Sequence, residues 1–325
     1  MSVSAAETDA LICAFRLNPW ESVGAEALGV EPTREAPLWL HFNLLDNRAR
    51  RYLEHAPSIH EDGKALLLGD DARIQAQVFE GGFAMILGDL YYDFNADPEN
   101  FGLLWVYVDA RRVITCRKHR VRSVDRVRHA FHHGPAPTAP FELFERLAAE
   151  IASGFAAVAS ELADAVEVAE DRVLAGYFRD QGNELGRIRR VLARLRRHKH
   201  ADRGALAILN QRLAGTLDED HRAELHEIVE RLDATGQDMD LVTERARLLQ
   251  EEIASQLNEA TNRNLYLLSI VTTVLLPVTL VTGIFGMNVG GLPFTSSEHG
   301  FWWVMFGMLV TVVATMALLR RARTL

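Results

Sequence analysis

Two uncharged, apolar segments near the C-terminus constrain the fold of this chain most. One runs from Leu265 to Phe285 and the other from Phe301 to Leu319. At 1.5 Å per residue each helix would be about 30 Å long, which matches the hydrocarbon thickness of a bilayer. The alternative, a pair of buried core helices, is disfavoured because two such segments in succession are rare in soluble proteins. We therefore predict transmembrane helices at 265–285 and 301–319.

Basic residues around these segments set the predicted orientation. Three arginines lie in the tail 320–325, and Arg263 precedes the first segment. The loop 286–300 contains no Lys or Arg. Because basic flanks stay on the cytoplasmic side, both termini are predicted to be cytoplasmic and the loop extracytoplasmic.

Charge and cysteine content limit the class of protein further. The net charge of −9 argues against a nucleic-acid partner, which requires a concentrated basic face. Cys13 and Cys116 have neither metal-type nor redox spacing. The first ten residues contain acidic but no basic side chains, unlike an export signal. Residues 1–264 are therefore expected to stay in the cytoplasm.

The expected fold class is α+β, with a cytoplasmic mixed α/β domain at 1–135. Its strand-like runs lie at 10–17, 38–44, 78–90 (with a turn at Gly81-Gly82), 103–108 and 112–116, and 48–56 is typical of a helix. Residues 136–264 are expected to be helical, with segments at 141–176, 187–199, 204–213 and 218–234. A last helix, 237–282, contains no glycine and continues into the first transmembrane segment as a long stalk.

A hairpin of two helices cannot enclose an aqueous path, so a pore needs several copies of the chain around one axis. A candidate lining face of the first transmembrane helix repeats at intervals of three and four residues. It consists of Asn262, Leu265, Leu268 (or Ser269), Thr272, Leu276, Thr279 and Gly283. For the threonines an alternative is open, in which each hydroxyl bonds its own backbone four residues back.

This lining face contains no carboxylate. Small divalent cations give up their water reluctantly, so passage of a hydrated or partly hydrated ion is expected. Asn288 at the outer mouth would touch the hydration shell through its amide oxygen, helped by backbone carbonyls around Gly286. The leucines of the face are candidates for a hydrophobic gate. Pro277 is either a bend in the helix or a proline that the membrane helix tolerates.

The run GIFGMN at 283–288 follows Pro277 and precedes a second transmembrane segment and a short basic tail. This arrangement resembles the CorA-type metal-ion transporters, whose signature is Gly-Met-Asn at the end of the penultimate helix. The resemblance covers essentially the whole chain. It implies a homopentameric funnel in the lipid bilayer, with Gly286, Met287 and Asn288 at the selective pore mouth.

Within that family, the loop NVGGLP at 288–293 and the segment 103–125 are similar to the zinc-transporting (ZntB) branch. The magnesium branch tends to carry an acidic pair in this loop, whereas here only Glu298 is present, farther along. The resemblance implies Zn²⁺ uptake coupled to protons across a bacterial inner membrane, with no resident cofactor. Two alternatives stay open: magnesium, cobalt or nickel transport in the same superfamily, and a membrane-anchored sensor that transports nothing.

A histidine group gives one further candidate metal site. His129, His132 and His133 are spaced i, i+3 and i+4, which gathers three imidazoles on one side of a helix. The competing interpretation is a helix C-terminus, where His complements the helix dipole. Because the chain lacks a phosphate-binding Gly-x-x-x-x-Gly-Lys loop and His-Glu-x-x-His, Cys-x-x-Cys and Gly-x-Ser-x-Gly motifs, we predict no enzymatic activity.

Overall fold

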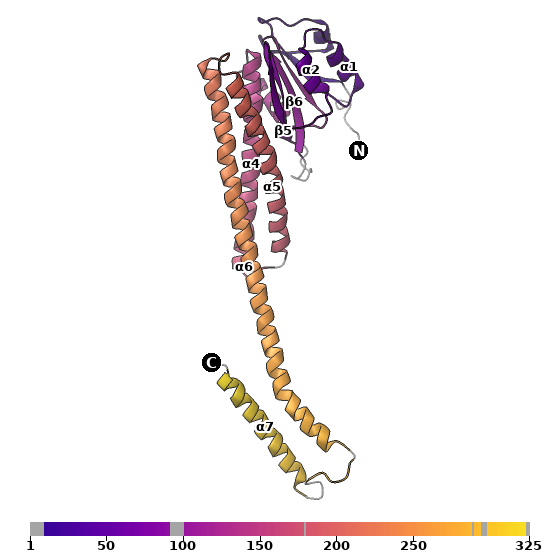
Figure 1. The fold of residues 1–325 in the computed structure, drawn as a ribbon, viewed down its shortest axis with the longest axis vertical. Helices are drawn as coiled ribbons and strands as arrows, with labels where there is room; N and C mark the ends of the chain where they lie inside the picture. Colours follow the sequence, from indigo (N-terminus) through magenta and orange to yellow (C-terminus); the bar gives the residue numbers. More distant parts are fainter. Residues whose placement is uncertain (1–9, 92–100, 179, 288, 294–297, 323–325) are drawn as a thin grey trace. The chain divides into compact units, whose positions relative to one another are not determined.

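The structure is a computed structural model that describes residues 10–91, 101–178, 180–287, 289–293 and 298–322 (Figure 1). The side chains of His132 and His133 also lie outside the described part. The chain forms two compact units, Met1–Leu249 and Gln250–Leu325. The first unit contains a β-sheet and several helices, and the second contains the end of one long helix and one further helix.

The sheet of the first unit has seven strands among the described residues, in the order β2-β1-β3-β7-β6-β5-β4. Its strands are β1 (Leu11–Arg16), β2 (Glu21–Val23), β3 (Leu38–Asn43), β4 (Gln75–Phe79), β5 (Gly82–Leu90), β6 (Phe101–Asp109) and β7 (Arg112–Arg117). Only β3 and β7 pair in parallel, and the other neighbours are antiparallel. Gly81 makes the β4–β5 turn at φ +83°, a conformation that glycine adopts without steric cost.

Helices cover both faces of this sheet. On one face lie α1 (Asn47–His55) and α2 (Glu61–Leu68), whose buried Leu53 and Leu67 share an apolar core with alternate residues of the central strands. On the other lie α3 (Arg122–His133), α4 (Pro140–Leu174) and α5 (Gln181–Arg212) (Figure 1). There the Phe144 ring of α4 meets the Phe83 ring of β5 edge-on, with 4.8 Å between centroids. The alternation of strand side chains thus supplies two cores.

The long helix α6 (Glu219–Phe285) begins in the first unit, where polar pairs join it to both neighbouring helices. Arg245 pairs with Glu170 of α4 at 2.8 Å, and Arg203 of α5 pairs with Asp233 at 3.0 Å. At the start of α6, His221 Nδ1 lies 3.0 Å from the Glu145 carboxylate of α4. These contacts fix the N-terminal part of α6 in a bundle with α4 and α5.

The structure corrects the predicted division of the helical region. The segments 187–199 and 204–213 form one helix, α5, and the segments 218–234 and 237–282 both lie in α6. α6 runs through Gly236 without a break, and the end of the Lys199 side chain of α5 lies where a Cβ at this position would be. Packing between α5 and α6 therefore outweighs the roughly 1 kcal/mol that glycine costs inside a helix.

Every predicted strand is present within a few residues of its expected bounds, as is the helix predicted at 48–56. The sequence did not predict β2, the 3-10 helix η2 (Ala25–Gly29) or α2. β2 has only three residues, and α2 contains Gly63, which disfavours a helix on propensity. Gly63 is required there because the Tyr107 ring occupies the space that a Cβ would take.

A buried hydrogen-bond chain joins the two parallel strands. Trp39 Nε1 of β3 donates to Thr115 Oγ1 of β7 at 2.8 Å, and His41 Nδ1 lies 2.8 Å from the same oxygen. Burial holds the pKa of His41 well below its usual value, so the imidazole is neutral and its Nδ1 can accept the hydroxyl proton. One hydroxyl thus satisfies two buried groups.

We expect Thr115→Val to lower the stability of the first unit by about 1–3 kcal/mol, because the Trp39 and His41 nitrogens would be left buried without a partner. Thermal unfolding of the purified full chain measures this loss. Thr216→Val is the matched control, since Thr216 is exposed and the described contacts give its hydroxyl no partner. An equal shift for both variants would show that the buried hydroxyl has no special role.

Candidate functional site

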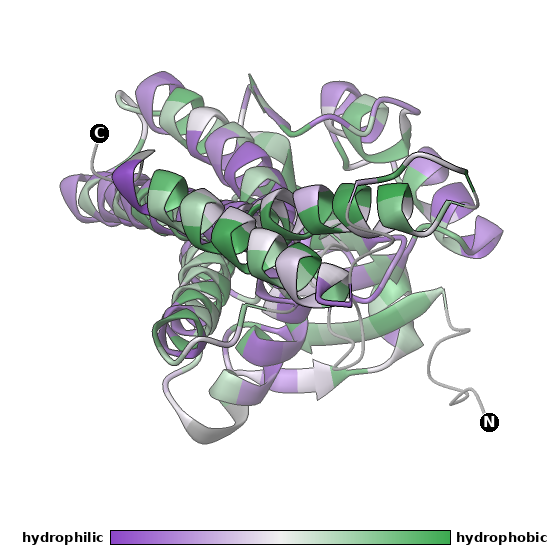
Figure 2. Cartoon of the chain, turned by 90° about the horizontal axis from the view of Figure 1, so that it is seen from below, coloured by the Kyte–Doolittle hydropathy of each residue, from purple (hydrophilic) through white to green (hydrophobic). Residues whose placement is uncertain are grey.

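The second unit contains the end of α6 and α7 (Gly300–Ala322), and the chain reverses direction between them (Figure 1). Both helices are long and apolar enough to cross a membrane, and their apolar windows are not buried within the chain. Figure 2 shows the green, apolar residues that dominate both. These apolar surfaces need lipid or further copies of the chain to cover them.

Partial burial follows a helical period on both helices. On α6 the half-buried residues are Ile270, Val274, Pro277, Val278, Val281 and Phe285. On α7 they are Val304, Met308, Thr311, Val312, Thr315 and Leu319. Residues spaced by three or four share one helix face, so each helix turns one apolar face towards the other within this hairpin.

The predicted lining residues lie on a different face of α6, and all of them are exposed. They are Asn262, Leu265, Leu268, Ser269, Thr272, Leu276, Thr279 and Gly283. The exposed fractions of Leu265, Leu268 and Leu276 are 58%, 62% and 63%. Because α7 covers the opposite side, this face stays uncovered in a single chain.

The structure shows that the threonine hydroxyls of this face bond their own backbone, which the sequence left open. Thr272 Oγ1 donates to Leu268 O at 2.8 Å, and Thr279 Oγ1 donates to Leu275 O at 2.9 Å. Thr273, off the predicted lining face, makes the same kind of bond to Ser269 O. Each hydroxyl proton is therefore used within the helix, while the oxygen keeps lone pairs that can accept from a water molecule.

The end of α6 explains the glycine of the Gly-Met-Asn run. Gly286 N donates to Thr282 O at 2.9 Å, and a Cβ on Gly286 would lie 3.0 Å from that same carbonyl oxygen. Met287 follows with 50% of its surface exposed. Asn288 lies outside the described residues, so its place at the pore mouth stays a prediction. The glycine lets the chain turn tightly against the last carbonyls of the helix.

Pro277 lies inside α6 and on the face that α7 covers. It cannot donate a hydrogen bond to the carbonyl of Thr273, one turn earlier. A helix that lacks this hydrogen bond can bend at the proline. That Pro277 bends α6 stays a prediction.

The predicted histidine site is only partly described. His129 Nδ1 lies 2.6 Å from the backbone oxygen of Asp125 in the same helix, so one ring nitrogen is already occupied. The side chains of His132 and His133 lie outside the described part. Elsewhere in the ranges that the structure covers, no three His, Cys, Asp or Glu side chains gather closely enough to hold a metal ion.

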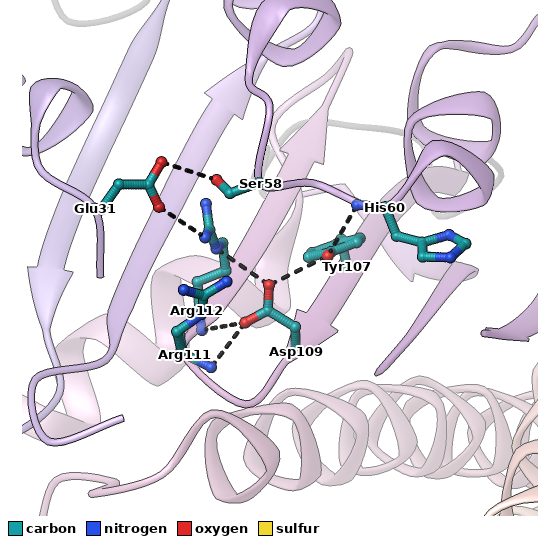
Figure 3. A network of polar contacts seen from close by, with 7 residues as sticks. All are labelled: Glu31, Ser58, His60, Tyr107, Asp109, Arg111 and Arg112. Carbon is teal, nitrogen blue, oxygen red and sulfur yellow. Dashed lines mark hydrogen bonds and ion pairs between the residues drawn. The ribbon is translucent and has the colours of Figure 1, made fainter. Parts of the chain in front are cut away.

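One hollow of the first unit was not predicted from the sequence. It has a volume of about 510 Å³ and lies beside the turn between β6 and β7. Tyr107 donates to Asp109 at 3.2 Å, the Arg112 guanidinium lies 3.1 Å from the same carboxylate, and both Arg111 and Arg112 donate backbone N–H groups to it (Figure 3). Four of these residues lie together at 107–112, but Glu31, which pairs with Arg112 at 3.4 Å, lies far away in the sequence. A local pattern therefore does not predict the whole network.

These features define a class: a membrane protein with a large unit of sheet and helices and a C-terminal helical hairpin in which α6 exposes an uncharged face opposite α7. Residues 34–321 match the family model described as CorA-like Mg²⁺ transporter protein. The chain belongs to this family.

Named relatives agree with that assignment. The zinc transport protein ZntB of Yersinia pseudotuberculosis serotype O:1b (strain IP 31758) is 26% identical over 304 residues, which are 93% of each chain. The divalent cation transporter CmaX of Pseudomonas aeruginosa is 30% identical over 284 residues, or 86% of this chain and 85% of the relative. Because these relatives are transporters, this chain is a divalent-cation transporter of the CorA superfamily rather than an enzyme.

Solved structures show the same architecture. The full-length CmaX protein superposes with a TM-score of 0.82 at 28% identity, covering 96% of this chain and 98% of that one. The CorA magnesium transporter from Methanocaldococcus jannaschii gives a TM-score of 0.79, covers 95% and 97%, and at 18% identity supports the fold alone.

We expect Gly286→Ala to cost about 1 kcal/mol or more, because its methyl group would press against Thr282 O at the end of α6. The thermal midpoint of the purified chain should fall, and metal flux through reconstituted protein should fall with it. Gly307→Ala on α7 is the matched control, since a Cβ there meets nothing within 4 Å. If both variants behave like the wild type, the tight turn at Gly286 does not matter for the site.

Proposed function

We propose that this chain is one subunit of a homopentameric Zn²⁺ transporter that takes up zinc with protons across a bacterial inner membrane. Both termini would lie in the cytoplasm, and the ion would pass along the uncovered face of α6. The observation that carries the proposal is this face: exposed, free of charged side chains from Leu265 to Gly283, and opposite the side that packs on α7.

The uncovered face supports an assembly of several copies. A single hairpin in lipid would expose the threonines of this face to hydrocarbon without forming a path. Copies arranged around an axis with this face inward would instead enclose a path and keep the purely apolar faces towards lipid. The number five and the funnel shape are carried over from the family resemblance.

The chemistry of the face favours an ion that keeps water. Threonine oxygens and the Asn262 amide offer only weak dipoles, which cannot replace the inner water shell of a small divalent cation. Leu265, Leu268 and Leu276 would form apolar rings that close the path by excluding water. At the outer end, Gly286, Met287 and Asn288 would select the hydrated ion through dipoles weak enough to release it.

Two observations favour zinc as the cargo. Several relatives at 25–27% identity are named as zinc transport proteins, and the loop 288–293 lacks an acidic pair. A second candidate is another divalent cation, because the relative at 30% identity is named only as a divalent cation transporter. The proton-coupled uptake rests on the resemblance to the zinc branch.

A flux assay tests the proposal directly. Purified chain in proteoliposomes is given Zn²⁺, Mg²⁺ or Co²⁺ outside, with equal or opposed pH on the two sides. A membrane potential of 100 mV contributes about 4.6 kcal/mol to a divalent ion, whereas one pH unit contributes only about 1.4 kcal/mol per proton. The potential must therefore be clamped with potassium and an ionophore, so that any remaining effect of the pH gradient reports coupling.

We expect Zn²⁺ entry to exceed Mg²⁺ entry and to accelerate when the outside is more acidic. A rate of zinc entry that does not change with the pH gradient, measured at clamped membrane potential, would contradict proton coupling. Faster Mg²⁺ or Co²⁺ entry would support the second candidate, and the absence of flux for every ion would support a membrane-anchored sensor.

A further inference from the structure

Asp202 of α5 is a fully buried carboxyl group with half of its hydrogen-bonding capacity unused. It lies against the sheet, where its Oδ1 accepts from Gly88 N of β5 at 2.7 Å. Its Oδ2 is buried and has no hydrogen-bond partner, and its exposed fraction is 0%. An unpaired buried oxygen of this kind requires an explanation.

A second unpaired atom lies beside the first. His198 is one helical turn before Asp202 and stacks on Phe101, with 4.4 Å between the ring centroids. Its Nδ1 is buried without a hydrogen-bond partner. A Cβ on Gly88 would lie 3.1 Å from His198 Nδ1 and 3.4 Å from Asp202 Oδ2. Both unpaired atoms therefore border the small space that the glycine keeps open.

Asp89, the next residue on β5, is a second buried carboxyl group with a different environment. Its oxygens accept from Leu90 N at 2.7 Å, from Ser123 N at 3.1 Å and from the Ser123 hydroxyl. Three donors stabilise a carboxylate at Asp89, whereas Asp202 has only one donor. If the two groups share one charge, the negative charge belongs on Asp89 and the proton on Asp202.

Among the described residues, no basic side chain contributes to the electrostatics of Asp202, although Arg73 and Arg194 line the hollow beside His198. Glu150 of α4 adds negative charge near Asp89, and β4, which also packs on α5, carries no charged residue between Gln75 and Phe79. On α5 itself, the nearby Arg197 acts on His198. A buried carboxylate without a partner costs far more free energy than the protonated, neutral carboxyl group.

Burial, with a smaller contribution from the Asp89 charge, raises the pKa of Asp202 well above its usual value. Burial likewise raises the pKa of Asp89 to about 6. Burial, together with Arg197, lowers the pKa of His198, which leaves a neutral imidazole able to accept a proton at Nδ1. The raised pKa of Asp202 and the lowered pKa of His198 agree with a protonated carboxyl group as donor and a neutral imidazole as acceptor.

We propose that Asp202 is a buried proton-binding site in the cytoplasmic-type unit, with its carboxyl proton directed towards His198 Nδ1 across the space beside Gly88. The proton closes the contact between α5 and β5. Its loss adds a second buried negative charge, which is repelled by the charge of Asp89, and weakens that contact. The site makes the position of α5 on the sheet sensitive to pH, whichever metal the protein carries.

The direction of the pH dependence follows from the raised pKa. Below about pH 4, the ordinary Asp pKa, Asp202 is protonated in the folded and unfolded chain alike, and its stabilising contribution is fully present. As pH rises towards the raised folded pKa, the unfolded chain gains by ionising and this stability is lost. Asp202→Asn keeps a similar shape but cannot ionise, so it should remove this part of the loss.

The test uses the purified full chain and infrared spectroscopy in D₂O at about pH 6, where ordinary carboxyl groups are ionised. We expect the wild type to show a protonated-carboxyl C=O band that is reduced in Asp202→Asn and unchanged in Asp164→Asn, an exposed residue of α4. The thermal midpoint of Asp202→Asn should also fall less steeply between pH 5 and pH 8 than that of the wild type.

An unchanged carboxyl band in folded Asp202→Asn would overturn the proposal. If this variant does not fold, Asp89→Asn combined with Glu145→Gln replaces it, because burial raises the pKa of Asp89 to about 6 and of Glu145 to about 7, so both contribute to the wild-type band at pH 6. This double variant should keep a protonated-carboxyl band, which then belongs to Asp202, and loss of the band contradicts the site. Both readouts are independent of transport. Failure of zinc or proton coupling in the flux assay would therefore leave this result intact, and the reverse also holds.

Discussion

The uncovered face of α6 is the constraint on which the account of this protein depends. Within the hairpin, α7 covers one apolar side of α6, from Ile270 to Phe285. The opposite side keeps Leu265, Leu268 and Leu276 more than half exposed. A face that carries threonine hydroxyls within the span is less suited to lipid than a purely apolar face. Several copies with this face inward would satisfy it, and the same arrangement would create a path for a cation.

The sequence predicted the parts of the fold that depend on local patterns. Long uncharged runs identified both membrane helices, and alternating apolar residues between glycine turns identified the long strands. Helix continuity at Gly236 could not be predicted, because glycine disfavours a helix on propensity and the contacts of α6 with α5, such as Arg203 with Asp233, join residues far apart in the sequence. The helix α2 was missed for a similar reason, since its Gly63 is required by the Tyr107 ring of β6.

The candidate site, too, could be predicted from the sequence only in part. Spacing placed the lining residues on one helix face, but it could not decide between the two uses of the Thr272 and Thr279 hydroxyls. The pair formed by Gly88 and Asp202 joins positions 114 residues apart in the chain, so no motif reveals it. Polar groups that meet only through tertiary packing need coordinates, whereas helix faces can be read from one periodic segment.

Cysteine accessibility on α6 tests the central claim most directly. The native thiols give little background, because burial raises the pKa of Cys13 to about 11 and also raises that of buried Cys116. Thr279→Cys lies on the proposed lining face, and Val281→Cys lies about 200° away on the side that α7 covers. We expect a charged, water-soluble thiosulfonate to modify Thr279→Cys and to block metal flux, while Val281→Cys stays unmodified. Modification of Val281→Cys with Thr279→Cys unreactive would contradict this claim.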